Sequence, residues 1–203
     1  MIVIIDYGMG NLKSVYNALL RIECETKISN KEEDIINADG LILPGVGAFE
    51  DCMLNLTNSG LIPVIKSEVA KGKPLLGICL GMQILFEKGY EGNETSGLGL
   101  LKGNIKLMHD SEVRIPHIGW NNLIINNEDP IAKNLSNNSY VYYVHSYCAT
   151  EMNETELVAY STYGTIKIPG LVRKGNVMGA QFHPEKSGEE GLTILKNFKE
   201  IVE

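Results

Sequence analysis

One segment, Leu75–Cys79, constrains the fold more than any other part of the sequence. It is apolar over its full length, it follows the turn-forming residues Gly72-Lys73-Pro74, and a helical pattern comes directly after it. A strand with apolar side chains on both faces is buried on both faces, which is typical of the centre of a parallel sheet. The segment therefore predicts an α/β fold whose central sheet is flanked by helices.

The first half of the chain repeats this alternation of strands and helices. The expected strands are Met1–Asp6, Cys24–Ser29, Ala38–Leu43 and Leu75–Cys79. The expected helices are 12–21, after an N-cap at Asn11, then 61–70 and 80–88. Strands that alternate with helices form a mostly parallel sheet, because each helix carries the chain back across one face of the sheet.

The second half, from Leu100 to Phe182, changes to short β-like segments between Gly, Asn and Pro turns. The expected elements here are strands 104–108, 140–145, 157–161, 170–173 and 177–182, and a closing amphipathic helix 189–202. These strands either add antiparallel strands to the central sheet or form a small second sheet. No repeat, linker or low-complexity tract interrupts the chain, so we expect residues 1–203 to form a single domain.

Composition disfavours several classes of function. The net charge is −7 and no Lys/Arg-rich stretch is present, which argues against nucleic acid and anionic membranes as partners. The N-terminal apolar run is too short for a secretion signal, and no stretch reaches the roughly 20 residues that span a bilayer. The cysteines lack C-x-x-C spacing, so we expect no metal, no cofactor and no disulfide framework, in a cytoplasmic protein with reduced thiols.

The sharpest chemical feature is Gly77-Ile78-Cys79-Leu80-Gly81, where the apolar strand meets a helix. In such a turn the glycines allow close backbone approach, and the central residue is held in a strained conformation at the carboxyl edge of the sheet. The helix N-terminus favours a thiolate there, and the N–H of Leu80 can point at an oxyanion. A small buried structural cysteine is the competing interpretation, and it is preferred for Cys24, Cys52 and Cys148.

A thiol nucleophile requires a base and a group that orients the base. His183 stands at the end of a strand-like run, within Gln181-Phe182-His183-Pro184-Glu185. Residues two apart in an extended segment point to the same side, so Glu185 can hydrogen-bond the His183 ring. Taken alone, the segment fits a surface turn equally well. Together with the turn at Cys79 it predicts a Cys–His–Glu triad.

The loop Pro44-Gly45-Val46-Gly47 follows another expected strand and should lie at the same edge of the sheet. The glycines on both sides of Val46 allow its peptide to turn an N–H inward, as a second oxyanion donor, and to reorient when substrate binds. The alternative is a loop whose glycines serve only the turn.

These motifs together resemble the triad-type (class I) glutamine amidotransferases. Four segments resemble one group in that family, the glutaminase subunits of imidazole glycerol phosphate synthase: Asp6–Asn11, Pro44–Phe49, Pro116–Asn121 and Tyr142–Tyr147. They occur over nearly the whole chain in the expected order. The resemblance implies a flavodoxin-like α/β fold and hydrolysis of glutamine to glutamate and ammonia through a thioester on a cysteine.

The resemblance also assigns roles to residues. It makes Cys79 the nucleophile, His183 the acid and base, and Glu185 the group that orients the ring. It places the oxyanion between the N–H groups of Leu80 and Val46. The implied substrate-binding residues are Gly45, Gly47, Gln83, His145, Ser146 and Tyr147.

The resemblance further implies a heterodimer with a (β/α)₈-barrel cyclase subunit. That partner receives the ammonia and makes imidazole glycerol phosphate and an aminoimidazole carboxamide ribotide in histidine biosynthesis. The residues implied to face it are Asn11, His117, Trp120, Asn121 and Lys186. Trp120 fits an interface anchor and a core residue about equally well.

Three alternatives stay open at this point. The first keeps the chemistry in a different synthase, for pyridoxal phosphate, anthranilate or formylglycinamidine; segments Asp6–Asn11 and Pro116–Asn121 argue against it. The second is a binding protein with an idle triad, which an intact set of three residues disfavours. The third is a cysteine peptidase, which the context of Gln83 disfavours because it indicates a free amino acid as substrate.

Overall fold

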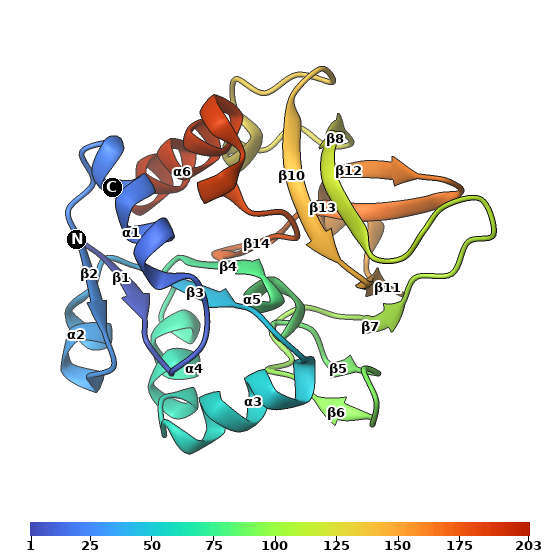
Figure 1. Cartoon of the computed structure of the whole chain (residues 1–203). Coiled ribbons are helices and arrows are strands. Elements are labelled where there is room, and N and C mark those ends of the chain that lie inside the picture. The colour runs from blue at the N-terminus through green and yellow to red at the C-terminus, as the bar shows by residue number, and fades with distance from the viewer.

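The computed structural model describes residues 1–203, and its centre is an eight-stranded mixed sheet in the order β2-β1-β3-β4-β14-β13-β12-β9 (Figure 1). The parallel strands are β2 (Thr26–Ser29), β1 (Ile2–Ile5), β3 (Gly40–Gly45), β4 (Leu75–Cys79) and β14 (Val177–Ala180). The antiparallel strands are β13 (Ile166–Lys174), β12 (Leu157–Tyr163) and β9 (Ile124–Ile125). The α/β fold expected from the sequence is confirmed.

Helices cover the parallel part of the sheet on both faces (Figure 1). On one face α1 (Leu12–Arg21) and α6 (Gly188–Val202) pack on side chains such as Ile4 and Ile78. The opposite face carries α2 (Glu32–Asn37), α3 (Phe49–Asn58), α4 (Ile62–Ala70) and α5 (Leu80–Gln83). β4 lies at the centre, and all five of its residues are buried, as its apolar sequence predicts.

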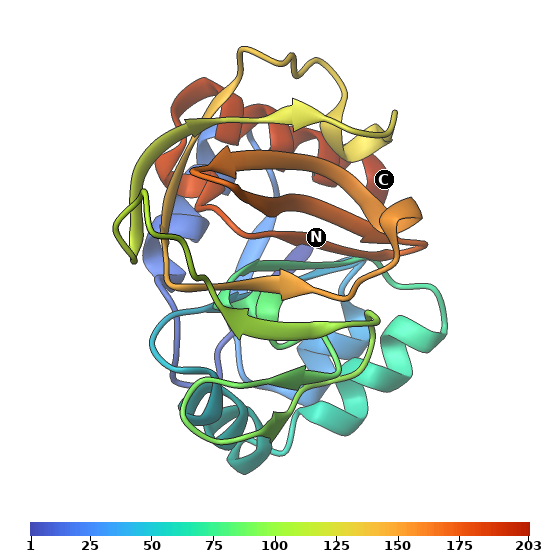
Figure 2. The same cartoon turned by 90° about the vertical axis from the view of Figure 1, so that its right-hand side faces the viewer.

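Two smaller sheets lie beside the carboxyl edge of the parallel strands (Figures 1 and 2). One pairs β10 (Tyr140–His145) with β8 (His117–Asn122) in antiparallel fashion. The other has the order β11-β7-β5-β6, with strands Tyr147–Thr150, Asn104–Leu107, Lys88–Gly89 and Thr95–Ser96. The second half of the chain therefore does both things left open by the sequence: it extends the central sheet and it builds small additional sheets.

The expected helix 80–88 is wrong beyond Gln83, where α5 ends. Ile84, Leu85 and Phe86 follow and are all fully buried. The N–H groups of Leu85 and Phe86 donate to the carbonyls of Met82 and Gln83, so the last turn tightens to bonds between residues three apart and the helix ends. The chain turns instead and enters β5. The sequence analysis also did not predict α2, α3 or strand β8.

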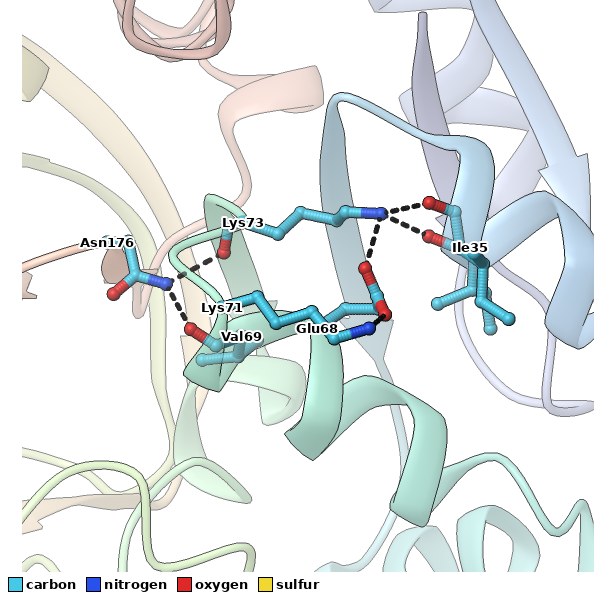
Figure 3. Close-up of polar contacts among 7 residues, drawn as sticks. Ile35, Glu68, Val69, Lys71, Lys73 and Asn176 are labelled. Carbon is cyan, nitrogen blue, oxygen red and sulfur yellow. Dashed lines mark hydrogen bonds and ion pairs between the residues drawn. The ribbon is translucent and has the colours of Figure 1, made fainter.

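The start of β4 is fixed by a cluster of polar side chains (Figure 3). Lys73 lies 3.0 Å from a Glu68 oxygen and donates to the carbonyls of Ile35 and Ile36 at 2.7 Å each, which ties the end of α2 to α4. Asn176, in the turn before β14, donates to the carbonyls of Val69 and Lys73 at 2.8 Å. These contacts satisfy the last carbonyls of α2 and give the Val69 carbonyl of α4 a second donor beside the Gly72 N–H.

Candidate functional site

Cys79 ends β4 and begins α5 in a backbone conformation that few residues adopt. Its φ is 55° and its ψ is −114°. Glycines make the tight turn possible: a Cβ on Gly81 would lie 1.9 Å from the Leu43 carbonyl oxygen, and one on Gly77 would lie 2.6 Å from the Gly81 oxygen. This combination of φ and ψ lies outside the left-handed helical region, so the backbone of a non-glycine residue is strained there. The turn predicted from the sequence is therefore present, with the Cys79 side chain at the carboxyl edge of the sheet.

His183 and Glu185 reach the same edge from the short 3₁₀ turn Pro184–Lys186, between β14 and α6. The His183 Nδ1 lies 2.8 Å from a Glu185 carboxylate oxygen, and the two side chains are 6% and 1% exposed. The second Glu185 oxygen is buried and makes no hydrogen bond. The carboxylate therefore fixes which ring nitrogen carries the proton and leaves Nε2 for chemistry.

The electrostatics of His183 depend on Cys79. Burial alone lowers the pKa of the ring, but a negatively charged Cys79 sulfur on one side and the Glu185 carboxylate on the other outweigh it. The net effect raises the pKa of His183 to about 9. At neutral pH the ring therefore holds a proton beside the Cys79 sulfur.

Cys79 and His183 line one cavity of about 410 Å³. Most of the other lining residues were predicted from the sequence as oxyanion, substrate or partner residues: Val46, Gly47, Leu80, Gln83, His145, Ser146, Tyr147 and Lys186. The remaining three are Glu91, Pro116 and Val144. A cavity of this size suits a small, amino-acid-sized molecule.

The two predicted oxyanion residues are both close to Cys79 in the fold and belong to different elements. Leu80 is the first residue of α5, and Val46 follows β3, whose last residue pairs with Cys79. Gly45 corrects the sequence analysis, because it does not line the cavity. A Cβ there would lie 2.5 Å from the Gly81 nitrogen, so Gly45 is a close packing contact between β3 and α5.

Gln83 and His145 are held by hydrogen bonds to the Tyr147 carbonyl. The Gln83 amide nitrogen donates to that carbonyl and to the Gln181 side-chain oxygen, both at 2.9 Å. The His145 Nδ1 lies 2.8 Å from the same carbonyl, and its Nε2 lies 3.1 Å from the His117 Nδ1. Burial lowers the pKa of both histidines to about 4, so this pair is neutral near pH 7.

The predicted partner-facing residues divide into two groups. Trp120 is 55% exposed and Lys186 is exposed, while Asn11 and Asn121 are half-buried. His117 is a correction: it is only 3% exposed and stacks between the Tyr143 and Tyr163 rings, at centroid distances of 4.8 and 4.1 Å. It therefore belongs to the core beneath the β10–β8 sheet and not to an exposed surface.

Glu91 was not predicted from the sequence. One of its carboxylate oxygens accepts the Phe49 N–H at 2.8 Å, at the start of α3, and the residue lines the cavity. Glu91 stands in a Gly-flanked turn among many acidic residues, and no spacing marks it out. No group of three or more His, Cys, Asp or Glu side chains is arranged to hold a metal ion. No helix combines the length and the hydropathy that a membrane span requires.

Comparisons with known proteins agree with this geometry. Residues 3–201 match the family model of class-I glutamine amidotransferases. The chain is 56% identical over 99% of its length to the imidazole glycerol phosphate synthase subunit HisH of Lactococcus lactis, covering 98% of that protein. It is 48% identical to HisH of Oceanobacillus iheyensis, with both chains fully covered.

Solved structures show the same fold at lower identity. A crystal structure of a glutamine amidotransferase superposes with a TM-score of 0.78 at 23% identity, covering 98% of both chains. The structure of PurLQS from Thermotoga maritima gives 0.77 at 21% identity, covering 100% of this chain and 98% of that one. By fold, by family match and by full-length identity to curated relatives, the chain belongs to the class-I glutamine amidotransferases, in the group of the HisH subunits of imidazole glycerol phosphate synthase.

Proposed function

We propose that this chain hydrolyses glutamine through Cys79, His183 and Glu185 and supplies the ammonia to a cyclase subunit in histidine biosynthesis. The observation that carries the proposal is the convergence of the Cys79 thiol and the Glu185-bound His183 ring on one amino-acid-sized cavity. Family membership supports the reaction class, and the full-length identity to HisH subunits supports the pathway.

In the first half-reaction the Cys79 thiolate attacks the side-chain amide carbon of glutamine. The negative charge that develops on oxygen is held by the backbone N–H groups of Leu80 and Val46, each worth about 3 kcal/mol of barrier when well placed. His183 then gives its proton to the departing nitrogen, so that ammonia leaves and a γ-glutamyl thioester remains. The raised pKa of His183 suits this step, because the ring starts it protonated.

In the second half-reaction the neutral His183 ring takes a proton from water. The resulting hydroxide attacks the thioester carbon, and the same two N–H groups hold the new oxyanion. The C–S bond then breaks, glutamate is released and Cys79 returns as the thiolate beside the protonated ring. Glu185 holds the ring orientation through both halves.

The cavity also offers groups for the α-carbon end of glutamine. Glu91 uses one carboxylate oxygen on the Phe49 N–H, so its other oxygen is free to accept from an α-ammonium group. The Ser146-Tyr147 segment lies on the cavity wall and provides backbone amide groups for the α-carboxylate. Both N–H groups of the Gln83 side chain are already donated to Tyr147 and Gln181, so Gln83 offers its side-chain oxygen as a second acceptor for the α-ammonium group. A charged site for both α-groups favours the free amino acid over a peptide, whose α-groups are in amide bonds.

The proposed partner surface is the outer face of the β10–β8 sheet, beside the mouth of the cavity. Ile118, Trp120, Tyr140 and Val144 are 59%, 55%, 54% and 38% exposed, and Val144 also lines the cavity. Apolar exposure of this kind marks protein interfaces. We propose that the (β/α)₈-barrel cyclase covers this face together with Asn11, Asn121 and Lys186. Ammonia then passes to the cyclase without meeting bulk water, where it would be protonated.

A cytoplasmic location is part of the proposal. All four cysteines are free thiols, as a reducing compartment keeps them.

The direct test is Cys79→Ala in the complex with the cyclase. Glutamine-dependent synthesis should disappear, whereas synthesis from added ammonium salts should continue at the wild-type rate. Equal loss of both activities would contradict the role of Cys79. A glutaminase assay with and without the cyclase and its nucleotide ligand should show a slow isolated subunit, because the Val46 peptide needs the partner to turn inward. Equal rates would refute this gating.

A further inference from the structure

Tyr7 lies outside the triad and the cavity, yet it contacts the strand from which the Val46 loop starts. The side chain is buried, and its hydroxyl donates to the Pro44 carbonyl at 2.6 Å. The Cys52 sulfur lies 3.1 Å from the same hydroxyl oxygen. Because the hydroxyl hydrogen is directed at Pro44, the Cys52 thiol is the donor in the second contact.

Burial keeps both groups protonated. It raises the pKa of Cys52 to about 12 and that of Tyr7 well above its usual value. The chain of hydrogen bonds from the thiol through the hydroxyl to the carbonyl is therefore neutral at every physiological pH, and neither group is available as a second nucleophile or base.

The two partners of the Tyr7 hydroxyl flank the loop that carries Val46. Pro44 lies in β3 just before the loop, and Cys52 lies in the first turn of α3 just after it. On the edge that faces β1, β3 has no neighbouring strand beyond Ile42, because its pairing with β1 stops there. One side-chain hydroxyl therefore ties both ends of the loop where the sheet no longer does.

The start of the Val46 loop, the Pro44–Gly45 peptide, is also held on the side that faces α5. Gly45 packs so closely on the start of α5 that a Cβ would lie 2.5 Å from the Gly81 nitrogen. The Pro44–Gly45 peptide is thus held between α5 on one side and Tyr7 on the other. The Val46 N–H belongs to the next peptide, so only the bonds around Gly45 and Val46 are left to turn it.

We propose that Tyr7 is a positioning residue for the oxyanion donor at Val46, acting through the Pro44 carbonyl. This inference rests on the glutaminase function proposed above. With the loop base held, the Val46 N–H needs only a local peptide rotation to meet the oxyanion. Without the Tyr7 hydroxyl the Pro44–Gly45 peptide moves as well. The Val46 N–H then points at the oxyanion in a smaller fraction of molecules, which slows the chemical step. Of the residues proposed to bind ground-state glutamine, only Gly47 belongs to this loop; Gln83, Glu91 and the Ser146-Tyr147 segment lie on other parts of the cavity wall.

The test compares Tyr7→Phe with Tyr163→Phe in the complex with the cyclase. Tyr163 also donates its hydroxyl to a backbone carbonyl, that of Arg114 at 2.8 Å, in an exposed contact away from the Val46 loop, so it controls for the loss of a tyrosine hydroxyl. Tyr7→Phe should lower kcat of the glutaminase reaction about tenfold with KM within about twofold, while Tyr163→Phe leaves both unchanged. Equal effects of the two variants, or an unchanged kcat in Tyr7→Phe, would overturn the inference.

A tetrahedral mimic gives a readout that a purely structural role would not move. The thiolate adds to the aldehyde carbon of L-glutamate γ-semialdehyde: a C–S bond forms and the carbonyl electron pair moves to oxygen, where the oxyanion donors hold it. Its inhibition constant should rise about tenfold in Tyr7→Phe, whereas that of the product glutamate should stay the same. An equal rise of both inhibition constants would indicate general damage to the cavity and would contradict the role of Tyr7.

Two Cys52 variants keep the test valid if Tyr7→Phe fails to fold. Cys52→Ser retains a donor to the Tyr7 hydroxyl and should keep wild-type kcat, and Cys52→Ala should lower kcat about twofold; equal kcat values for the two variants would contradict the inference.

The proposed function fails separately, if the wild-type complex releases no ammonia and does not bind the semialdehyde. An active wild type with an equally active, folded Tyr7→Phe would reject only the role of Tyr7.

Discussion

The two ends of β4 both carry buried polar groups, and the groups are paired in different ways. At the start of the strand, Glu68 contacts Lys71 at 2.5 Å and Lys73 at 3.0 Å, and Lys73 also donates to two carbonyls (Figure 3). At the other end, Glu185 has one oxygen on His183 and a second oxygen without a partner, and the cavity opens beside them.

This difference separates a structural cluster from a reactive one. A buried polar group whose partners are all present contributes to folding, and it has nothing left to offer a ligand. The His183 ring lies at a concave edge with its pKa raised, and Glu185 occupies only one of its ring nitrogens, so the ring can still exchange a proton. The closed cluster at Lys73 and the open one at Cys79 should therefore respond oppositely to substitution: the first in stability, the second in activity.

The largest expected effect is at the open end. Glu185→Gln keeps the shape of the side chain but removes the charge that fixes the His183 ring and favours its protonated form. We expect kcat for glutamine to fall about 100-fold, with the Tm within a few degrees of wild type. Steady-state glutaminase kinetics on the complex measure this. Ammonia-dependent synthesis is the control, and a large loss there too would contradict a role confined to glutamine hydrolysis.

The pH dependence of stability and of kcat should also reflect the Cys79 end of β4. The pKa of His183 is raised from 6.5 to about 9, so the folded state binds this proton more tightly than the unfolded chain does. The associated stability is present in full below pH 6.5 and is lost as pH rises through 9. The glutaminase kcat should fall above pH 9, about tenfold per unit, because the ring then lacks the proton for ammonia. If kcat instead falls near pH 6.5, Cys79 and Glu185 do not raise the pKa of His183.

At the closed end, Lys73→Met should change stability and not chemistry. The methionine keeps much of the buried stem but leaves the Ile35 and Ile36 carbonyls without a donor and Glu68 without its buried partner. We expect the Tm to fall by about 5 °C, measured by scanning calorimetry, with kcat and KM unchanged well below the Tm. Lys71→Met is the matched control, since that lysine is 65% exposed and should matter far less. Equal losses in both variants would contradict the assigned role of Lys73.

The smallest expected effect concerns the neutral histidine pair next to the cavity. Burial lowers the pKa of His117 and of His145 to about 4, so the folded state binds these protons less tightly than the unfolded chain does. The stability they contribute is present above pH 6.5 and is lost as pH falls through 4. His117→Phe keeps a ring between Tyr143 and Tyr163 and should flatten the decline of the unfolding free energy between pH 6.5 and 4. Denaturant titrations at several pH values measure this decline. If the unfolding free energy of the variant falls as steeply with pH as that of the wild type, the pKa of His117 is not lowered by burial.

The parallel half of the fold could be predicted because its strands are buried on both faces. Uninterrupted apolar runs such as Leu75–Cys79 leave little choice of structure, and the turn at Cys79 follows from its glycines. The short elements could not be predicted in the same way. β5 has two residues, Lys88 and Gly89, and its place is set by its neighbours β6 and β7 and not by its own sequence.

The candidate site shows the same division. The residues of the proposed triad carry local signals in the sequence; Cys79 and His183 line one cavity, and Glu185 contacts His183. Glu91 carries none, because its position depends on the course of the chain after α5. His117 was misplaced because β8 was not recognised as a strand: residues three apart in a strand face opposite sides, so an exposed Trp120 requires a buried His117. Gly45 and Gly47 look alike in the sequence, and only the packing of β3 on α5 separates them.

The pairing of β8 with β10 has a consequence for how the protein can vary. Trp120 and Ile118 pair with Tyr142 and Val144 on the outer side, and the alternate pair His117 and His145 lies on the inner side. Inserting or deleting one residue within either strand would exchange the sides, and so disrupt the proposed partner surface and the cavity wall in a single step. Changes in length during evolution should therefore accumulate in the connecting segments 108–116 and 126–139, whereas the two strands keep a constant length.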